Sequence, residues 1–152
     1  MKDYFNMIHI DEPDAVFDAV IDEKGYLKLP EAIELEPEMI LTNFVENGVL
    51  LLYTMERFEE LKSRLDMLNN LDASIRMLKR CLISEAMKIE TDKSRRIFIE
   101  DLYLERMGFD SQNADRKSFS VKILKFPSRL WIASLPSYEK ILKKLQEQKE
   151  QF

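Results

Sequence analysis

Two aspartates, Asp22 and Asp92, begin similar turns seventy residues apart in the chain. An Asp at the start of a turn commonly caps its own backbone. An Asp followed four residues later by Arg can also hold the guanidinium, as the spacing of Asp92 and Arg96 allows. A held guanidinium can bind two phosphate oxygens or a guanine edge. The two aspartates could instead be catalytic carboxylates, but their places in turns favour backbone capping over acid/base chemistry.

Other residue types exclude several classes of site. The 152-residue chain has 3 Gly, too few for the Gly-rich loops of dinucleotide and P-loop sites. Its single Cys and single His exclude a disulfide framework and a zinc cluster. Cys81, among leucines, is predicted to be a buried structural thiol, and His9 has no partner at a recognisable spacing. We therefore expect no cofactor, metal, small-molecule substrate or enzyme activity.

Charge is unevenly distributed along the chain. The net charge is −5, but residues 1–76 carry 7 basic and 17 acidic residues, whereas residues 77–152 carry 16 and 11. Residues 76–96 contain seven basic and three acidic side chains. A basic patch on one face can bind phosphate even in an acidic protein, because salt screens distant charges. A solvated helix face joined to a charged turn is the alternative interpretation of this segment.

Alternating apolar residues predict a strand, a turn and a second strand around each aspartate, with strands at 17–22 and 26–30 and again at 87–92 and 96–100. A second correspondence, spaced by eighty, matches the strand at 50–52 with the one at 130–132. Each of these strands leads into an amphipathic helix with a predicted N-cap, Thr54 or Ser134. The expected apolar faces contain Phe58, Leu61, Leu65 and Leu68 in one helix and Tyr138, Ile141, Leu142 and Leu145 in the other. The increase in spacing from seventy to eighty predicts an insertion at 108–118.

Three aromatic residues, Phe119, Phe126 and Trp131, are expected in the core or a subunit interface rather than stacked on bases.

A short basic helix is predicted to connect the two halves. Asp72 is placed either to cap its N-terminus or to pair with Arg76 one turn later. Arg76, Lys79 and Arg80 share a face opposite Ile75, Leu78 and Leu82.

This twofold pattern resembles the MraZ family of bacterial transcriptional regulators, which are built from two AbrB-like swapped-hairpin units. The resemblance extends from about residue 17 to residue 145 and is most specific at 76–80, 84–86 and 92–99. The family signature, an Asp and an Arg four residues later in each half, is retained at Asp92 and Arg96. Tyr26 stands where the first Arg belongs, Arg95 replaces the turn glycine, and Glu100 replaces a proline. The chain is therefore identified as a divergent member.

The resemblance implies an α+β fold with a first repeat at 1–71, a connecting helix at 72–86 and a second repeat at 87–152. It implies a sequence-specific regulator that binds double-stranded promoter DNA of a division and cell-wall gene cluster as a ring-like homo-oligomer. We expect the protein in the cytoplasm, because the sequence shows neither a signal peptide nor a membrane span. The DNA-binding role that the resemblance implies would associate it with the nucleoid. The alternative is an oligomeric interaction module of the same fold that has lost DNA binding. The predicted DNA-binding residues are Asp22, Lys24, Arg76, Lys79, Arg80, Asp92, Lys93, Arg95 and Arg96.

Overall fold

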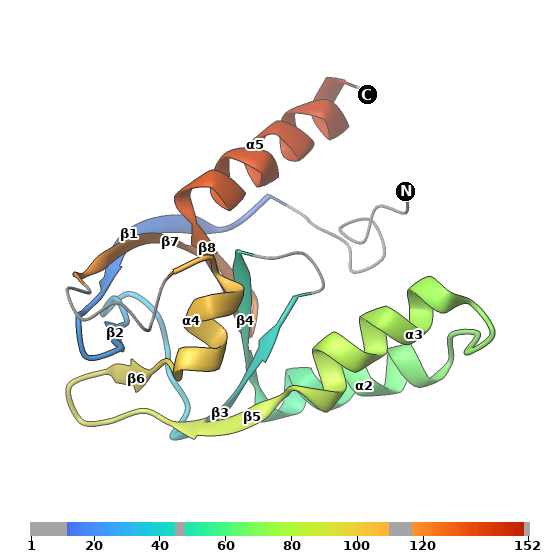
Figure 1. Ribbon diagram of the computed structural model, residues 1–152, viewed down its shortest axis with the longest axis horizontal. Coiled ribbons are helices and arrows are strands. Elements are labelled where there is room, and N and C mark those ends of the chain that lie inside the picture. The colour runs from blue at the N-terminus through green and yellow to red at the C-terminus, as the bar shows by residue number, and fades with distance from the viewer. Residues whose placement is uncertain (1–11, 45–47, 110–116, 151–152) are drawn as a thin grey trace.

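The structure is a computed structural model that describes residues 12–44, 48–109 and 117–150 (Figure 1). Within these residues, one sheet is accompanied by four α-helices and a π-helical turn, so the predicted α+β class is confirmed. The strands are β1 (Ala15–Ile21), β2 (Tyr26–Lys28), β3 (Glu38–Asn43), β4 (Val49–Thr54), β5 (Met87–Glu90), β6 (Arg96–Phe98), β7 (Phe119–Phe126) and β8 (Arg129–Ser134). The helices are α2 (Met55–Asp66), α3 (Ala73–Lys79), the π-helical turn η1 (Arg80–Ser84), α4 (Asp101–Arg106) and α5 (Leu135–Glu150).

The sheet is antiparallel throughout, in the order β5-β3-β4-β8-β7-β1-β2-β6. Its two edge strands, β5 and β6, are separated in sequence by residues 91–95 alone. That connection can span at most about 20 Å, whereas eight strands laid flat would extend over about 34 Å. The sheet must therefore curl until its edges approach each other, and the turn that begins at Asp92 joins them.

Strands from the two predicted halves are interleaved within this single sheet. β2 pairs with β6 and places Leu27 opposite Ile97, the residue seventy positions later. β4 pairs with β8 and places Leu51 opposite Trp131, the residue eighty positions later. Each of these matched strands thus lies beside its own counterpart. The domain boundaries and the assignment of two AbrB-like units remain predictions.

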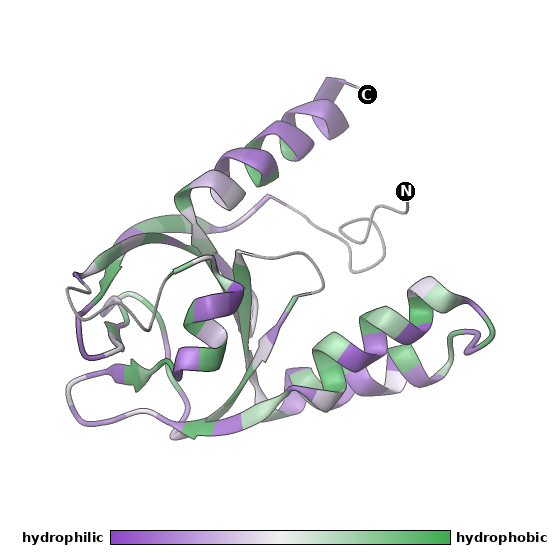
Figure 2. Cartoon of the chain, in the orientation of Figure 1, coloured by the Kyte–Doolittle hydropathy of each residue, from purple (hydrophilic) through white to green (hydrophobic). Residues whose placement is uncertain are grey.

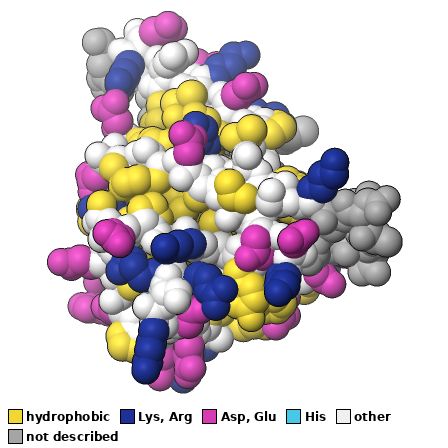
Figure 3. Space-filling model, turned by 90° about the vertical axis from the view of Figure 1, so that its left-hand side faces the viewer, with side chains coloured by type: hydrophobic (Ala, Val, Ile, Leu, Met, Phe, Trp, Pro, Cys, Tyr) yellow, Lys and Arg dark blue, Asp and Glu magenta, His cyan; other side chains and the backbone are white. Residues whose placement is uncertain are grey.

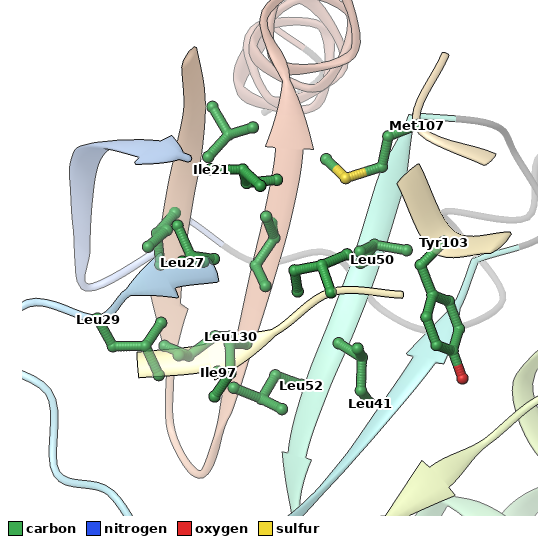
Figure 4. Packing of buried hydrophobic residues seen from close by; sticks show 14 of the residues in the cluster. Ile21, Leu27, Leu29, Leu41, Leu50, Leu52, Ile97, Tyr103, Met107 and Leu130 are labelled. Atoms are coloured by element: carbon green, nitrogen blue, oxygen red, sulfur yellow. The ribbon is translucent and has the colours of Figure 1, made fainter. Parts of the chain in front are cut away.

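Alternate residues of the strands enter two separate apolar clusters. One lies inside the curled sheet, where Leu27 and Ile97 are fully buried beside Leu52 and Leu130 (Figure 4). The other covers the opposite face and contains Trp131 with residues of α2, α3 and α5. Figure 2 shows hydrophobic and hydrophilic residues alternating along these helices, as expected for helices with one buried face. Burial of Trp131 and Phe126 confirms their predicted place in the core.

The helix starts agree with the sequence analysis. Thr54 accepts a hydrogen bond from the Arg57 backbone N–H, and the Ser134 hydroxyl accepts one from Ser137, so both predicted N-caps are confirmed. Two residues of the expected apolar faces are exposed instead. Leu68 lies beyond the end of α2, and Leu68 and Leu142 are each 38% exposed. In α3, Asp72 caps the helix by accepting from the Ser74 N–H at 2.8 Å.

The second half contains a helix that was not predicted and an insertion that the structure describes only in part. Helix α4 was not predicted, and it immediately precedes the predicted insertion at 108–118. Residues 110–116 of that insertion lie outside the described residues, as does His9.

Candidate nucleic-acid interface

The first turn is organised by Asp22. Its Oδ1 accepts hydrogen bonds from the backbone N–H groups of Lys24 and Tyr26, both at 2.9 Å. Its backbone carbonyl accepts a third, from Gly25, at 3.0 Å. Gly25 has a φ of +96°, a conformation that glycine adopts without a steric penalty. The carboxylate therefore serves as a backbone cap, as predicted for an Asp at this place.

The second turn repeats this arrangement around Asp92 and adds an ion pair. Oδ1 of Asp92 accepts from the N–H groups of Ser94 and Arg96, at 2.9 and 2.8 Å, and its carbonyl accepts from Arg95 at 3.0 Å. Nε of Arg96 donates to the remaining carboxylate oxygen, Oδ2, at 2.9 Å. The expected pairing of Asp92 with Arg96 is thus present.

These contacts change the acidity of Asp92. The Arg96 backbone N–H is the main cause that lowers the pKa of the carboxyl below its ordinary value, and the Arg96 side chain and the Ser94 N–H act in the same direction. Desolvation opposes them but is outweighed. Asp92 is therefore a carboxylate at neutral pH, and its charge neutralises part of the charge of Arg96.

Pairing of β2 with β6 brings residues of both turns onto one outward face. Lys28 lies directly opposite Arg96, and Tyr26 lies directly opposite Phe98. The residue between them on each strand points into the core, because side chains alternate along a strand. We call the outward face formed by Tyr26, Lys28, Arg96 and Phe98 the ribbon surface.

Arg96 is in contact with an aromatic ring as well as with its carboxylate. Its guanidinium carbon lies 4.7 Å from the centre of the Tyr26 ring, within the range of a cation–π interaction. The Tyr26 ring in turn packs against Phe98, with 5.3 Å between ring centres. The only side-chain hydrogen bond of Arg96 within the described residues uses Nε, so its two terminal nitrogens have no hydrogen-bond partner there.

Arg95 is directed away from the ribbon surface. Its guanidinium donates to the backbone carbonyls of Leu29 at 3.4 Å and Pro30 at 2.6 Å, and also to that of Ile33. It has a φ of +65°, so the turn places a non-glycine residue in the left-handed region. These contacts give Arg95 a structural role, and the DNA contact expected for it from the sequence stays a prediction.

The basic residues of the connecting helix are not part of the ribbon surface. Arg76 donates to the carbonyls of Asn70 and Leu71, and Lys79 donates to the Asn70 side chain, so both hold the α2–α3 loop. Arg80 is the first residue of η1, which continues α3. Along the long axis of the molecule, α3 lies far from β6 (Figure 1). The structure therefore separates these three predicted residues from Asp92 and Arg96.

Three lysines surround the pair of turns. Lys24 and Lys93 are exposed at the tips of the two turns, and Lys28 is exposed on β2. Figure 3 views the molecule from the side on which β2 and β6 lie in Figure 1, and basic side chains adjoin hydrophobic ones there, with carboxylates among them. Neither a contact by Lys28 nor a role for Tyr26 was predicted from the sequence. Their alternation with the buried Leu27 marks them as outward residues, but only the register shows that they adjoin Arg96.

The described residues show no constellation for catalysis. Asp22 and Asp92 act as turn caps, and the buried Cys81 has a thiol pKa that burial raises, which opposes formation of a nucleophilic thiolate. Within residues 12–44, 48–109 and 117–150, no group of three or more His, Cys, Asp or Glu could hold a metal ion. Among the same residues, no helix has the length and apolar character needed to cross a membrane.

Comparison with known proteins found several curated relatives, all named transcriptional regulator MraZ. A transcriptional regulator MraZ from Coxiella burnetii (strain RSA 493 / Nine Mile phase I) is 32% identical over 97 residues, which are 60% of this chain and 64% of that protein. The MraZ regulator of Hydrogenovibrio crunogenus (strain DSM 25203 / XCL-2) is 28% identical over 98 residues, with the same coverage. That of Shewanella sp. (strain MR-7) is 31% identical over 85 residues, covering 52% of this chain and 56% of the relative.

The matched stretch spans less than two thirds of the length of each of these relatives. No family model matches the chain. The relatives are named as regulators of transcription and not as enzymes. Several MraZ regulators therefore match this chain at 28–32% identity, a similarity that supports membership of the MraZ family as a divergent member.

Proposed function

We propose that the protein is a sequence-specific transcriptional regulator that binds double-stranded DNA through the ribbon surface. The observation that carries the proposal is the arrangement of Arg96, whose Nε is held by Asp92 while both terminal nitrogens have no hydrogen-bond partner within the described residues. Two parallel N–H groups at the end of a restrained guanidinium fit a pair of phosphate oxygens or the O6 and N7 atoms of guanine. A restrained guanidinium also loses less conformational entropy on binding than a free one.

The Lys28–Arg96 pair supports an anionic ligand. Like charges directly opposite each other on neighbouring strands are destabilising, and these two side chains occupy such a position. A phosphate between them would remove the repulsion. A two-stranded antiparallel ribbon also has the width that the major groove of B-DNA admits. Lys93, at the tip of the second turn, would then extend the contact along the backbone.

Affinity at physiological salt requires more phosphate contacts than one ribbon supplies. We therefore propose a ring-like homo-oligomer whose ribbon surfaces contact successive DNA repeats, because linked contacts raise the effective concentration of each one. The target proposed from the family resemblance is the promoter of a division and cell-wall gene cluster. The same role would place the protein in the cytoplasm, associated with the nucleoid. Two AbrB-like units within the chain remain part of this proposal, supported by the pairing of β2 with β6 and of β4 with β8.

Selection from a pool of random-sequence duplexes tests DNA binding without an assumed operator. Several rounds of binding to the purified protein, followed by sequencing, should enrich a repeated motif. Affinity for the selected duplex should fall steeply between 50 and 200 mM salt, because binding releases counterions from the phosphates. Light scattering of the same preparation should show an oligomer. Recovery of unenriched sequence, or affinity that is independent of salt, would contradict the proposal.

The second candidate function is an oligomeric interaction module that has lost DNA binding. Two features favour it: Tyr26 replaces the first signature Arg, and residues 1–76 carry a net charge of −10. Phe98, which is 46% exposed on the ribbon surface, would suit a protein partner. This function predicts no enrichment of DNA in the selection.

A further inference from the structure

Tyr26 contacts two of the other three residues of the ribbon surface. Its ring lies between Phe98, directly opposite on β6, and Arg96, which is two residues away from Phe98 on the same strand. Diagonal neighbours in an antiparallel pair lie within reach of aromatic and long side chains. Phe98 itself packs over the first turn, since a Cβ on Gly25 would lie 3.0 Å from its ring. The ring of Tyr26 is thereby fixed next to the guanidinium.

Asp92 and Tyr26 restrain Arg96 by different means. Asp92 holds Nε through a hydrogen bond, and the Tyr26 ring contacts the guanidinium at 4.7 Å. The carboxylate fixes one nitrogen, whereas the ring limits movement of the guanidinium plane. Within the described residues, the Tyr26 side chain contacts its neighbours through its ring, and its hydroxyl has no hydrogen-bond partner. A phenylalanine ring could therefore make the same contacts.

We propose that Tyr26 is a positioning residue for Arg96. The Arg96 guanidinium makes the DNA contact, and residues next to both turns hold it in place. This inference rests on the proposed function of the ribbon surface. The first turn contributes the ring that orients the cation, and the second contributes the cation itself. The tyrosine at the position of the first signature Arg thus supports DNA binding instead of only marking the loss of a contact.

The two turns differ in charge, and this difference determines which end of the ribbon surface faces DNA. Asp92 is neutralised in part by Arg96, whereas Asp22 caps its turn and forms no ion pair within the described residues. An unneutralised carboxylate repels phosphate. Each protomer is therefore expected to contact the DNA backbone at the Arg96 and Lys28 end of the ribbon, away from Asp22.

A double-mutant cycle tests the role of Tyr26. Tyr26→Leu and Tyr26→Phe are compared in the full chain and in an Arg96→Ala background, with affinity for the selected duplex measured at low salt so that weak binding stays measurable. Tyr26→Leu should weaken binding by about two- to fivefold, the effect of losing an exposed cation–π contact. Tyr26→Phe should change it by less than about twofold. In the Arg96→Ala background, neither variant should have a further effect, because no guanidinium is left to orient.

Nuclear magnetic resonance of arginine-labelled protein gives a readout that is independent of DNA. The Arg96 Nε–H signal should shift in Tyr26→Leu, where the ring is lost, and stay close to its original position in Tyr26→Phe. Equal losses of affinity from Tyr26→Leu with and without Arg96, or an unmoved Nε–H signal, would overturn the positioning role. If Arg96→Ala alone leaves DNA binding unchanged, the proposed function fails, and the Nε–H signal still decides whether Tyr26 orients Arg96.

Discussion

Arg95 stands where Gly25 stands in the other turn, and both have a positive φ, +65° and +96° respectively. Each also donates its N–H to the carbonyl of the aspartate that begins its turn. The backbone of the second turn thus requires a conformation that an Arg adopts only at a cost. The three carbonyl contacts of its guanidinium offset that cost and attach the second turn to residues 29–33.

Replacement of Arg95 should separate these two effects. Arg95→Ala removes the guanidinium contacts but keeps the strained φ, whereas Arg95→Gly removes both. We expect both variants to unfold more easily than the wild type, with Arg95→Gly more stable than Arg95→Ala by about 1 kcal/mol. Urea denaturation gives the two free energies of unfolding. Equal stabilities of the two variants would contradict the account of this turn.

Lys28→Met should affect stability and DNA binding in opposite directions. The change removes the like-charge pair with Arg96 and keeps an unbranched side chain on β2, so the free energy of unfolding should rise by about 0.2–1 kcal/mol. It also removes a cation from the ribbon surface, so DNA affinity should fall and the salt dependence should become shallower. The two quantities are measured by urea denaturation and by titration of the selected duplex. Lys143→Met, on the exposed part of α5, is the matched control and should change neither by much.

Asp22→Asn should strengthen DNA binding. The amide oxygen of Asn can still accept the N–H groups of Lys24 and Tyr26, so the turn is retained, while one negative charge near the ribbon surface is removed. We expect a gain of about two- to fivefold in affinity at low salt, decreasing as salt screens the remaining charges. Asp92→Asn should do the opposite, because it removes the carboxylate that holds Arg96. A loss of affinity in both variants would show that the first turn contacts DNA directly.

Stability should depend on pH through Asp92. Because the pKa of Asp92 is lowered in the folded protein, its contribution to stability is present above the pKa of the unfolded chain, about 3.9, and is lost as pH falls through the folded value. Wild type should therefore exceed Asp92→Asn in stability at pH 7, and the difference should shrink as the pH is lowered below 4. Urea midpoints at several pH values measure it. A difference that grows on acidification would contradict the assigned direction of the shift.

Local features of the turns could be predicted from the sequence. The capping role of Asp22 and Asp92 and the pairing of Asp92 with Arg96 depend on residues within five positions of each other. The helix caps at Thr54 and Ser134 are local in the same way. Alternation of apolar residues also predicted the strands in which Leu27 and Ile97 are buried.

The rest of the site depends on contacts between distant residues. Lys28 and Tyr26 adjoin Arg96 only because β2 pairs with β6, a register that no nearby residue determines. Arg95 was grouped with its basic neighbours because its charge is visible in the sequence, whereas its carbonyl acceptors lie more than sixty residues away. Arg76 and Lys79 belong to the same basic segment as Arg96, but the α2–α3 hairpin carries them to another part of the molecule. Charge along a chain does not predict charge on one face.

The most direct test of the account is the effect of Arg96→Ala on affinity for the selected duplex, compared with Lys24→Ala and with Lys143→Ala on α5. We expect Arg96→Ala to weaken binding by about 1–3 kcal/mol and to make the salt dependence shallower, since it removes the restrained guanidinium. Lys24→Ala should have a small effect, and Lys143→Ala should have none. Thermal unfolding of each variant checks that the fold is retained. Equal losses from Arg96→Ala and Lys143→Ala, or no loss from Arg96→Ala, would contradict DNA binding through the ribbon surface.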